Sequence, residues 1–169
     1  MYAVVDIEAT GGNHIKGRII EIAIYIYDGE KIIDEFATLI NPETTIDWYV
    51  TKLTGISNNA VKDAPKFKDV AKKIVALVKG KIFVAHDVDF DYKFLKMELK
   101  NAGYEFDEPK ACTVKLSEKH LPNATSYSLG NLCEELGIII PEGDRHRAAG
   151  DALATTKLLG LLLGNEKVT

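Results

Sequence analysis

Two acidic residues near the start of the chain are the first candidates for chemistry. Asp6 and Glu8 lie in the run Val4-Val5-Asp6-Ile7-Glu8, whose β-branched residues favour a strand. Side chains alternate between the faces of a strand, so both carboxylates project from one face. Neighbouring carboxylates repel each other, and burying them unpaired is costly. Their oxygens suit a divalent cation, although two solvated acids at a strand end would give the same pattern.

A second acidic group follows the apolar run Ile82–Ala85, which is typical of a strand buried on both faces. Asp87 and Asp91 are four residues apart, so on one helix they would share a face. Asp87 stands where a capping acid belongs, and Asp89 is a further first-turn acid. Asp91 needs another explanation, because its apolar neighbours place it near the core. Junctions between a strand and the next helix form the ligand crevice of parallel α/β sheets.

His146 and Asp151 are the last candidates. Asp151 lies in the apolar segment 148–163, which predicts a buried helix in which a lone acid needs a partner. Five helical residues correspond to a rotation of about 140°, so the two side chains share a target only if His146 precedes the first turn. The alternatives are an ion pair of Asp151 with Arg145 or Arg147 and a solvated loop histidine.

These candidates need a scaffold that brings three distant segments together. The β-prone runs 18–27 and 32–40 flank Asp28-Gly29, a strong hairpin signal, so the chain should open with three antiparallel strands. Apolar periodicity then predicts alternating helices and strands. These later segments are a helix over 65–78, a strand over 82–85, a helix up to Gly103, a strand and helix within 111–121, and helices over 128–136 and 148–163. The fold class is therefore α/β with a mixed sheet.

Length and composition are those of an ordinary globular chain. The 169 residues, 46% hydrophobic and 27% charged, predict a single domain over 1–169. A net charge of −4 gives no general attraction to nucleic acid or anionic membranes. Two cysteines are too few for a disulfide framework, and no apolar run is long enough to span a bilayer. With no recognisable signal peptide, we expect a cytoplasmic location without membrane partners.

Together, these segments resemble the three exonuclease motifs of the DEDDh family of 3′–5′ exonucleases. The matching segments are 5–11 (VDIEATG), 85–91 (AHDVDFD) and 146–151 (HRAAGD), and Asn41-Pro42 and 53–56 (LTGI) also resemble the family. The likeness covers essentially the whole chain and is nearest to DnaQ-like proofreading subunits and domains of bacterial DNA polymerase III. Each motif alone is weak evidence, whereas three in order at this spacing are highly specific.

The resemblance implies a ribonuclease H-like fold that binds two divalent metal ions, Mg²⁺ or Mn²⁺. The metal ligands that it implies are Asp6, Glu8, Asp91 and Asp151, with Asp91 acting partly through water. His146 would be the general base that deprotonates the attacking water. The residues that it places at the terminal nucleotide are Ala9, Thr10, Gly11, Leu53, Thr54 and Phe90. The chain departs from the family at Asp87, where Asn is usual, and at Ala9, where Thr is common.

The implied activity is metal-dependent 3′–5′ hydrolysis of single-stranded or frayed DNA to nucleoside 5′-monophosphates, in proofreading or repair. One alternative is an RNA-trimming 3′–5′ exoribonuclease of the same family. Another is a non-catalytic interaction module on an exonuclease fold. Such a module would be expected to lack at least one catalytic residue, but the four acids and His146 are all present. The expected partners are DNA 3′ ends. The sequence leaves open whether RNA ends also bind and whether a DNA polymerase is associated or fused. It also leaves open whether the domain belongs to a longer chain.

Overall fold

The computed structural model describes residues 1–141 and 143–166. Five strands form one sheet in the order β3-β2-β1-β4-β5. At its centre, β1 (Tyr2–Ala9) is antiparallel to β2 (Ile19–Tyr27) and parallel to β4 (Ile82–Ala85). The edge strands are β3 (Ile32–Leu39), antiparallel to β2, and β5 (Lys110–Cys112), parallel to β4. The predicted antiparallel meander and mixed sheet are confirmed.

The turn between β2 and β3 follows from the residues at its start. The side chain of Asp28 accepts hydrogen bonds from the backbone N–H groups of Glu30 and Lys31, both at 2.8 Å. Such local bonds favour turns over continued strands. Every residue of β2 except Tyr25 is buried, so this strand forms much of the core. The hairpin predicted from the Asp28-Gly29 pair is confirmed.

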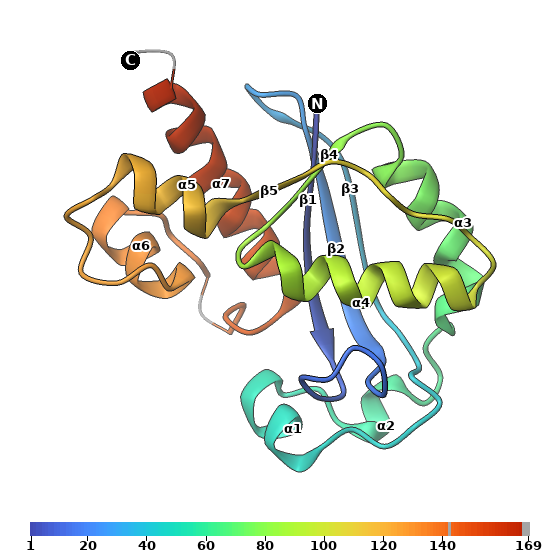
Figure 1. Ribbon diagram of the computed structural model, residues 1–169. Helices are drawn as coiled ribbons and strands as arrows, with labels where there is room; N and C mark the ends of the chain where they lie inside the picture. Colours follow the sequence, from blue (N-terminus) through green and yellow to red (C-terminus); the bar gives the residue numbers. More distant parts are fainter. Residues whose placement is uncertain (142, 167–169) are drawn as a thin grey trace.

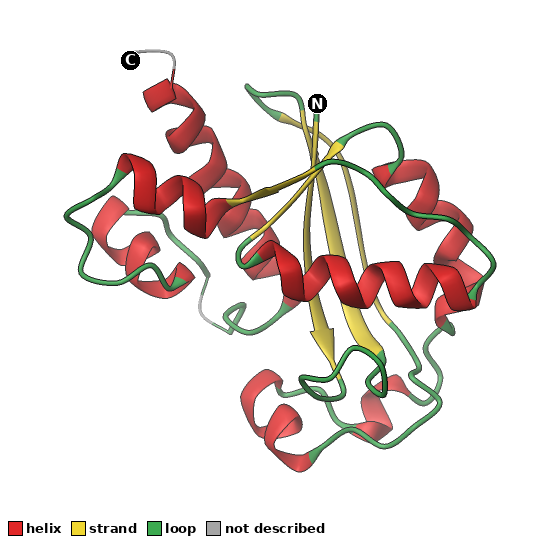
Figure 2. Ribbon diagram, viewed as in Figure 1, coloured by secondary structure: helices red, strands yellow, loops and turns green. Residues whose placement is uncertain are grey.

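Helices cover both faces of the sheet (Figures 1 and 2). They are α1 (Trp48–Thr54), α2 (Asn58–Val61), α3 (Phe67–Val78), α4 (Val88–Asn101), α5 (Thr113–His120), α6 (Leu129–Leu136) and α7 (Ala148–Glu166). On one face, α3 and α4 pack on a core that includes Val5 and Ile7 of β1. On the other face α7 contacts β1 and β2, and α5 and α6 pack against α7. Alternation along β1 therefore turns Asp6 and Glu8 toward the α7 face.

The short helices α1 and α2 lie beyond the ends of β1 and β2 (Figure 1). They close a separate apolar cluster around Ile20, Val50 and Ile56. Gly55 ends α1 in the left-handed conformation, with φ of 75°, which glycine adopts without strain. Within the described ranges, no helix combines the length and apolarity that crossing a bilayer requires.

Candidate active site

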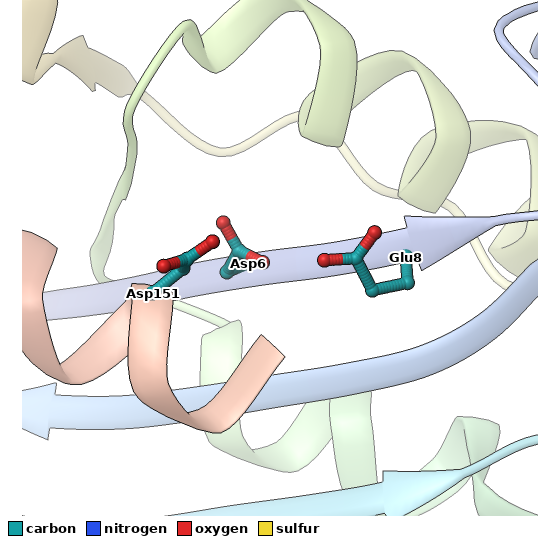
Figure 3. Close-up of side chains that lie close together, drawn as sticks. All are labelled: Asp6, Glu8 and Asp151. Atoms are coloured by element: carbon teal, nitrogen blue, oxygen red, sulfur yellow. The ribbon is translucent and has the colours of Figure 1, made fainter. Parts of the chain in front are cut away.

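Three carboxylates from two elements meet on the α7 face of the sheet. Asp6 and Glu8 project from β1, and Asp151 comes from the first turn of α7 to face them (Figure 3). One carboxylate oxygen of each residue lies within 4.8 Å of the others. The structure therefore brings together residues 145 positions apart, as the sequence predicts for these three.

Asp91 lies beside this cluster and outside the set of three. β4 pairs with β1 only as far as Val84 opposite Val4, which leaves the next part of β1 without a strand on that side. Asp91, from the first turn of α4, binds this unpaired part of β1: its Oδ1 accepts the backbone N–H of Ile7 at 3.0 Å. The side chain is 4% exposed, so it approaches the pair of acids from within the protein.

Burial and mutual repulsion favour the neutral forms of these acids. Burial, and next the charges of Asp91 and Glu8, raise the pKa of Asp6 well above its usual range. Burial, followed by the charge of Asp151, raises the pKa of Glu8 to about 8. Burial likewise raises the pKa of Asp91 and of Asp151. The fold thus holds the ionised acids at a free-energy cost at neutral pH, which a cation would offset.

The donor set fits a divalent cation. Asp151 Oδ1 is buried without a hydrogen-bond partner, and unpaired buried oxygens of this kind are rare in folded proteins. Among the described residues, none donates a hydrogen bond to the carboxylate of Asp6 or Glu8. The converging ligands are all oxygens, which Mg²⁺ and Mn²⁺ prefer. The residues present therefore suit the metal ions that the sequence motifs imply.

His146 precedes α7, as expected, and the backbone joins it to the cluster. Its N–H donates to Asp151 Oδ2 at 3.1 Å, which occupies the second oxygen of that carboxylate. His146 adopts a left-handed conformation with φ of 57°, rare for residues other than glycine. Strained backbone of this kind clusters at functional sites, where the surrounding structure enforces it.

An ion pair that sequence reasoning missed fixes the start of α7. The guanidinium of Arg147 binds Glu21 of β2, with Nη2 to Oε1 at 2.6 Å, and Glu21 Oε2 also accepts the Ala148 N–H at 2.9 Å. Glu21 lies directly across the β1–β2 ladder from Glu8. The alternative of an ion pair between Asp151 and Arg147 is therefore wrong. A buried acid in the otherwise apolar strand β2 was the available signal.

Asp87 occupies the predicted N-cap position of α4 but does not cap the helix with its side chain. It precedes α4 in a left-handed conformation, with φ of 70°, and its side chain makes no capping hydrogen bond. The expectation of a side-chain cap is wrong, as is that of one helical face shared with Asp91. Asn and Asp are the non-glycine residues that tolerate this conformation best, which accounts for Asp where the family usually has Asn.

The residues after Glu8 form a tight turn at the edge of the site. The β1–β2 register shifts between Glu8 and Ala9, and the chain then leaves the sheet. Ala9 and Thr10 are buried, and Thr10 Oγ1 accepts the backbone N–H of Arg18 at 3.0 Å. A Cβ added at Gly11 would lie 2.9 Å from the carboxylate of Asp47. A larger residue at position 11 would therefore require the side chains of Asp47 and Tyr49 to move.

The remaining predicted substrate residues differ in exposure. Leu53 is 56% and Phe90 37% exposed, so both apolar side chains are open to a ligand. Phe90 lines a cavity of about 250 Å³ with Gly12 of the turn after β1. Thr54 is buried, and its hydroxyl donates to Val50 O at 2.9 Å within α1. Its side chain therefore supports the end of α1.

Comparison with known sequences agrees with this geometry. The sequence model of the exonuclease family RNase_T matches residues 3–159. A PolC-type DNA polymerase III of Caldanaerobacter subterraneus subsp. tengcongensis is 36% identical over 157 residues, covering 93% of this chain and 11% of the polymerase. The 3′–5′ exonuclease DinG of Bacillus subtilis is 37% identical over 156 residues, covering 91% of this chain and 16% of DinG. The chain thus spans under a fifth of the length of these relatives.

Solved structures establish the fold. Exonuclease X in complex with 5′-overhanging duplex DNA superposes with a TM-score of 0.75 at 24% identity, covering 100% of this chain and 93% of that one. E. coli exonuclease I in complex with a dT13 oligonucleotide superposes with a TM-score of 0.85 at 16% identity, covering 99% of this chain and 42% of that one. The expected ribonuclease H-like exonuclease fold is confirmed.

Proposed function

Because the chain belongs to the RNase_T exonuclease family, we propose that it is a 3′–5′ exonuclease that depends on divalent metal ions. Its substrates are single-stranded or frayed DNA ends in the cytoplasm, and its products are nucleoside 5′-monophosphates. The observation that carries the proposal is the cluster of Asp6, Glu8 and Asp151, with a buried carboxylate oxygen that lacks a hydrogen bond. An apolar or hydrogen-bonded arrangement would be the expectation for a purely structural site.

Each residue of the site has a distinct role in this proposal. Asp6, Glu8 and Asp151 would hold the metal ions, and Asp91 would complete the ligand set, partly through water. The hydrogen bond from Ile7 N–H to Asp91 Oδ1 also fixes the backbone of β1 between its two acids. Bound divalent cations would neutralise phosphate charge and favour ionisation of a bound water. The backbone bond between His146 and Asp151 keeps the histidine next to the ligand set.

The reaction is hydrolysis of the last phosphodiester bond. His146 accepts a proton from water, whose oxygen forms a bond to the terminal phosphorus. The bond from that phosphorus to the 3′ oxygen of the preceding nucleotide breaks, and this oxygen takes up a proton. The shortened strand keeps a free 3′-hydroxyl and can react again. A histidine suits the base role because it changes protonation near neutral pH.

DNA is the favoured substrate because one relative is named a DNA polymerase, and proofreading or repair is the corresponding role. The proposed setting is a domain that works alone or beside a polymerase. Trimming of RNA 3′ ends is the second candidate, since every base offers an aromatic face to the exposed Leu53 and Phe90 whatever the sugar. A non-catalytic role is disfavoured, because all five predicted catalytic residues are present.

The test uses 5′-labelled DNA and RNA oligomers of matched sequence, incubated side by side with Mg²⁺ or Mn²⁺. We expect single strands to shorten stepwise from the 3′ end, faster than matched duplexes, with mismatched 3′ termini in between. A paired end must first fray, at a cost of a few kcal/mol. Faster loss of DNA supports the DNA assignment, and faster loss of RNA supports the second candidate. Shortening from the 5′ end, or cuts in a circular single strand, would contradict 3′–5′ exonuclease action.

A further inference from the structure

Two aromatic side chains at the start of α1 are open to solvent. Trp48 is 76% and Tyr49 47% exposed, and their rings meet edge-on with centroids 6.3 Å apart. Trp48 is the only tryptophan in the chain. Leu53, four residues after Tyr49, extends the exposed apolar face along the helix. Clustered apolar side chains of this kind on a surface mark interaction sites.

This aromatic pair lies next to the end of the strand that carries the catalytic acids. The N–H of Asp47, just before Trp48, donates to Thr10 O at 3.3 Å, and Thr10 is two residues past Glu8. Tyr49 lines a cavity of about 390 Å³ together with the turn after β1. Figure 1 shows α1 directly beyond the end of β1. The start of α1 therefore lies beside the turn that follows the two acids of β1.

Positive charge accompanies the rings. Lys52 is one helical turn after Trp48, on the same face of α1, and Lys16 lines the cavity beside Tyr49. Both lysines are exposed, and neither ammonium group forms an ion pair within the part of the chain that the structure describes. In a chain of net charge −4, this places two unpaired ammonium groups beside exposed aromatic rings, against one carboxylate, that of Asp47, in the same cavity. Aromatic rings interleaved with lysines match the bases and phosphates of a single-stranded nucleic acid.

We propose that Trp48 and Tyr49, flanked by Lys16 and Lys52, form a platform that binds unpaired nucleotides of the strand whose 3′ end occupies the acid cluster. This inference rests on the proposed function and names the feature that selects single strands. A base stacks on an aromatic ring whatever its identity. The faces of paired, stacked bases in a duplex are covered, so a duplex gains nothing from these rings.

The sole tryptophan provides a direct readout. The protein carries Asp6→Asn to prevent hydrolysis, and the probe is an unlabelled 12-nucleotide oligothymidylate in Mg²⁺. We expect saturable quenching of Trp48 emission by the single strand, and none by a blunt hairpin duplex at the same concentration. Fluorescence anisotropy of the same oligomer carrying a 5′ fluorescein reports binding independently. Saturable binding by anisotropy with unchanged Trp48 emission overturns this inference and leaves the proposed function intact. No binding by either readout overturns this inference, whereas cleavage of the same strand by the wild type tests the proposed function separately.

Variants separate stacking from general apolar contact. In the Asp6→Asn protein, we expect Trp48→Ala to raise the dissociation constant for the oligothymidylate by about tenfold or more. In the active protein, with Asp6 intact, the same substitution should raise KM by a similar factor with little change in kcat. Trp48→Phe, which keeps an aromatic face, should restore most of the affinity. The matched control is Ile139→Ala, because Ile139 is 77% exposed and lies after α6. Equal affinities for Trp48→Ala and Ile139→Ala overturn the inference.

The other possible occupant is a second copy of this chain. Size-exclusion chromatography over a range of protein concentrations tests it. We expect the same elution for the wild type and Trp48→Ala. Self-association that Trp48→Ala abolishes while affinity for the oligothymidylate stays unchanged would assign the face to a dimer and overturn the nucleic-acid platform.

Discussion

At the scale of single residues, the site depends on acids that the fold holds close together in a buried setting. That these acids share a site could be predicted from the sequence, because D-x-E on a strand and an acid in an apolar helix both need a compensating partner. The position of Asp91 beside the other three acids could not be predicted, since it depends on where β4 stops pairing with β1. Nor could the left-handed backbone of Asp87 and His146, which tertiary contacts impose.

The histidine is the first residue to test. We expect His146→Asn and His146→Ala to lower the single-turnover cleavage rate by roughly 10²–10⁴-fold, because both remove the base. Asparagine tolerates φ of 57° better than alanine does, so the Asn variant separates loss of the base from backbone strain. Circular dichroism and the thermal midpoint check that both variants fold. A wild-type rate for His146→Asn across the pH range would rule out the base assignment.

Asp87 offers a test of backbone strain close to the site. Asp87→Asn should leave the free energy of unfolding unchanged or higher, because asparagine tolerates the left-handed conformation. Asp87→Ala should lower it by about 1–2 kcal/mol, since alanine lacks that tolerance. Urea denaturation of the three proteins measures both effects. Equal stability of the alanine variant and the wild type would show that the strain is absent.

At the scale of elements, the strand-to-helix order was predictable and the contacts between elements were not. The order of elements follows from local sequence signals, namely Asp28-Gly29 for the hairpin, the apolar runs for strands and helices, and the glycines for helix ends. The pairing of Glu21 with Arg147 joins residues 126 positions apart, and no local pattern specifies it. This ion pair fixes the first turn of α7, and with it the placement of His146 and Asp151.

A matched pair of variants tests that role. Glu21→Gln removes the charge that binds Arg147 and should lower stability by about 1–2 kcal/mol, a moderate figure because Arg147 is partly exposed. Glu98→Gln breaks the similar pair of Glu98 with Arg18, at 2.8 Å, and Glu98 belongs to α4, on the face of the sheet opposite α7. We expect similar stability losses, with a kcat at least tenfold lower only for Glu21→Gln. Equal kcat losses would show that destabilisation alone lowers the rate.

At the scale of the whole molecule, one sheet carries all parts of the site. The central strand supplies two acids, and helices on opposite faces supply the other two, so the metal site forms only when both layers are assembled. The net charge of −4 means that affinity for nucleic acid must come from local features and not from a general positive field. The lack of a general positive field could be predicted from composition. The grouping of exposed aromatic side chains near the site could be recognised only in the folded structure.

The most direct test of the central claim is thermal unfolding of the metal-free protein during titration with Mn²⁺, with Asp6→Asn as the control. Without metal, Asp6→Asn should unfold at a higher temperature than the wild type, because it removes an acid whose ionisation both burial and the neighbouring carboxylates oppose. At metal concentrations about 100-fold above the dissociation constant, the wild type should gain about 2.7 kcal/mol, or roughly 5–10 °C. Asp6→Asn should gain much less, and activity should vanish in excess chelator and return with Mg²⁺ or Mn²⁺. Equal responses of the two proteins to Mn²⁺, together with full activity in excess chelator, would contradict the claim that these carboxylates form a catalytic metal site.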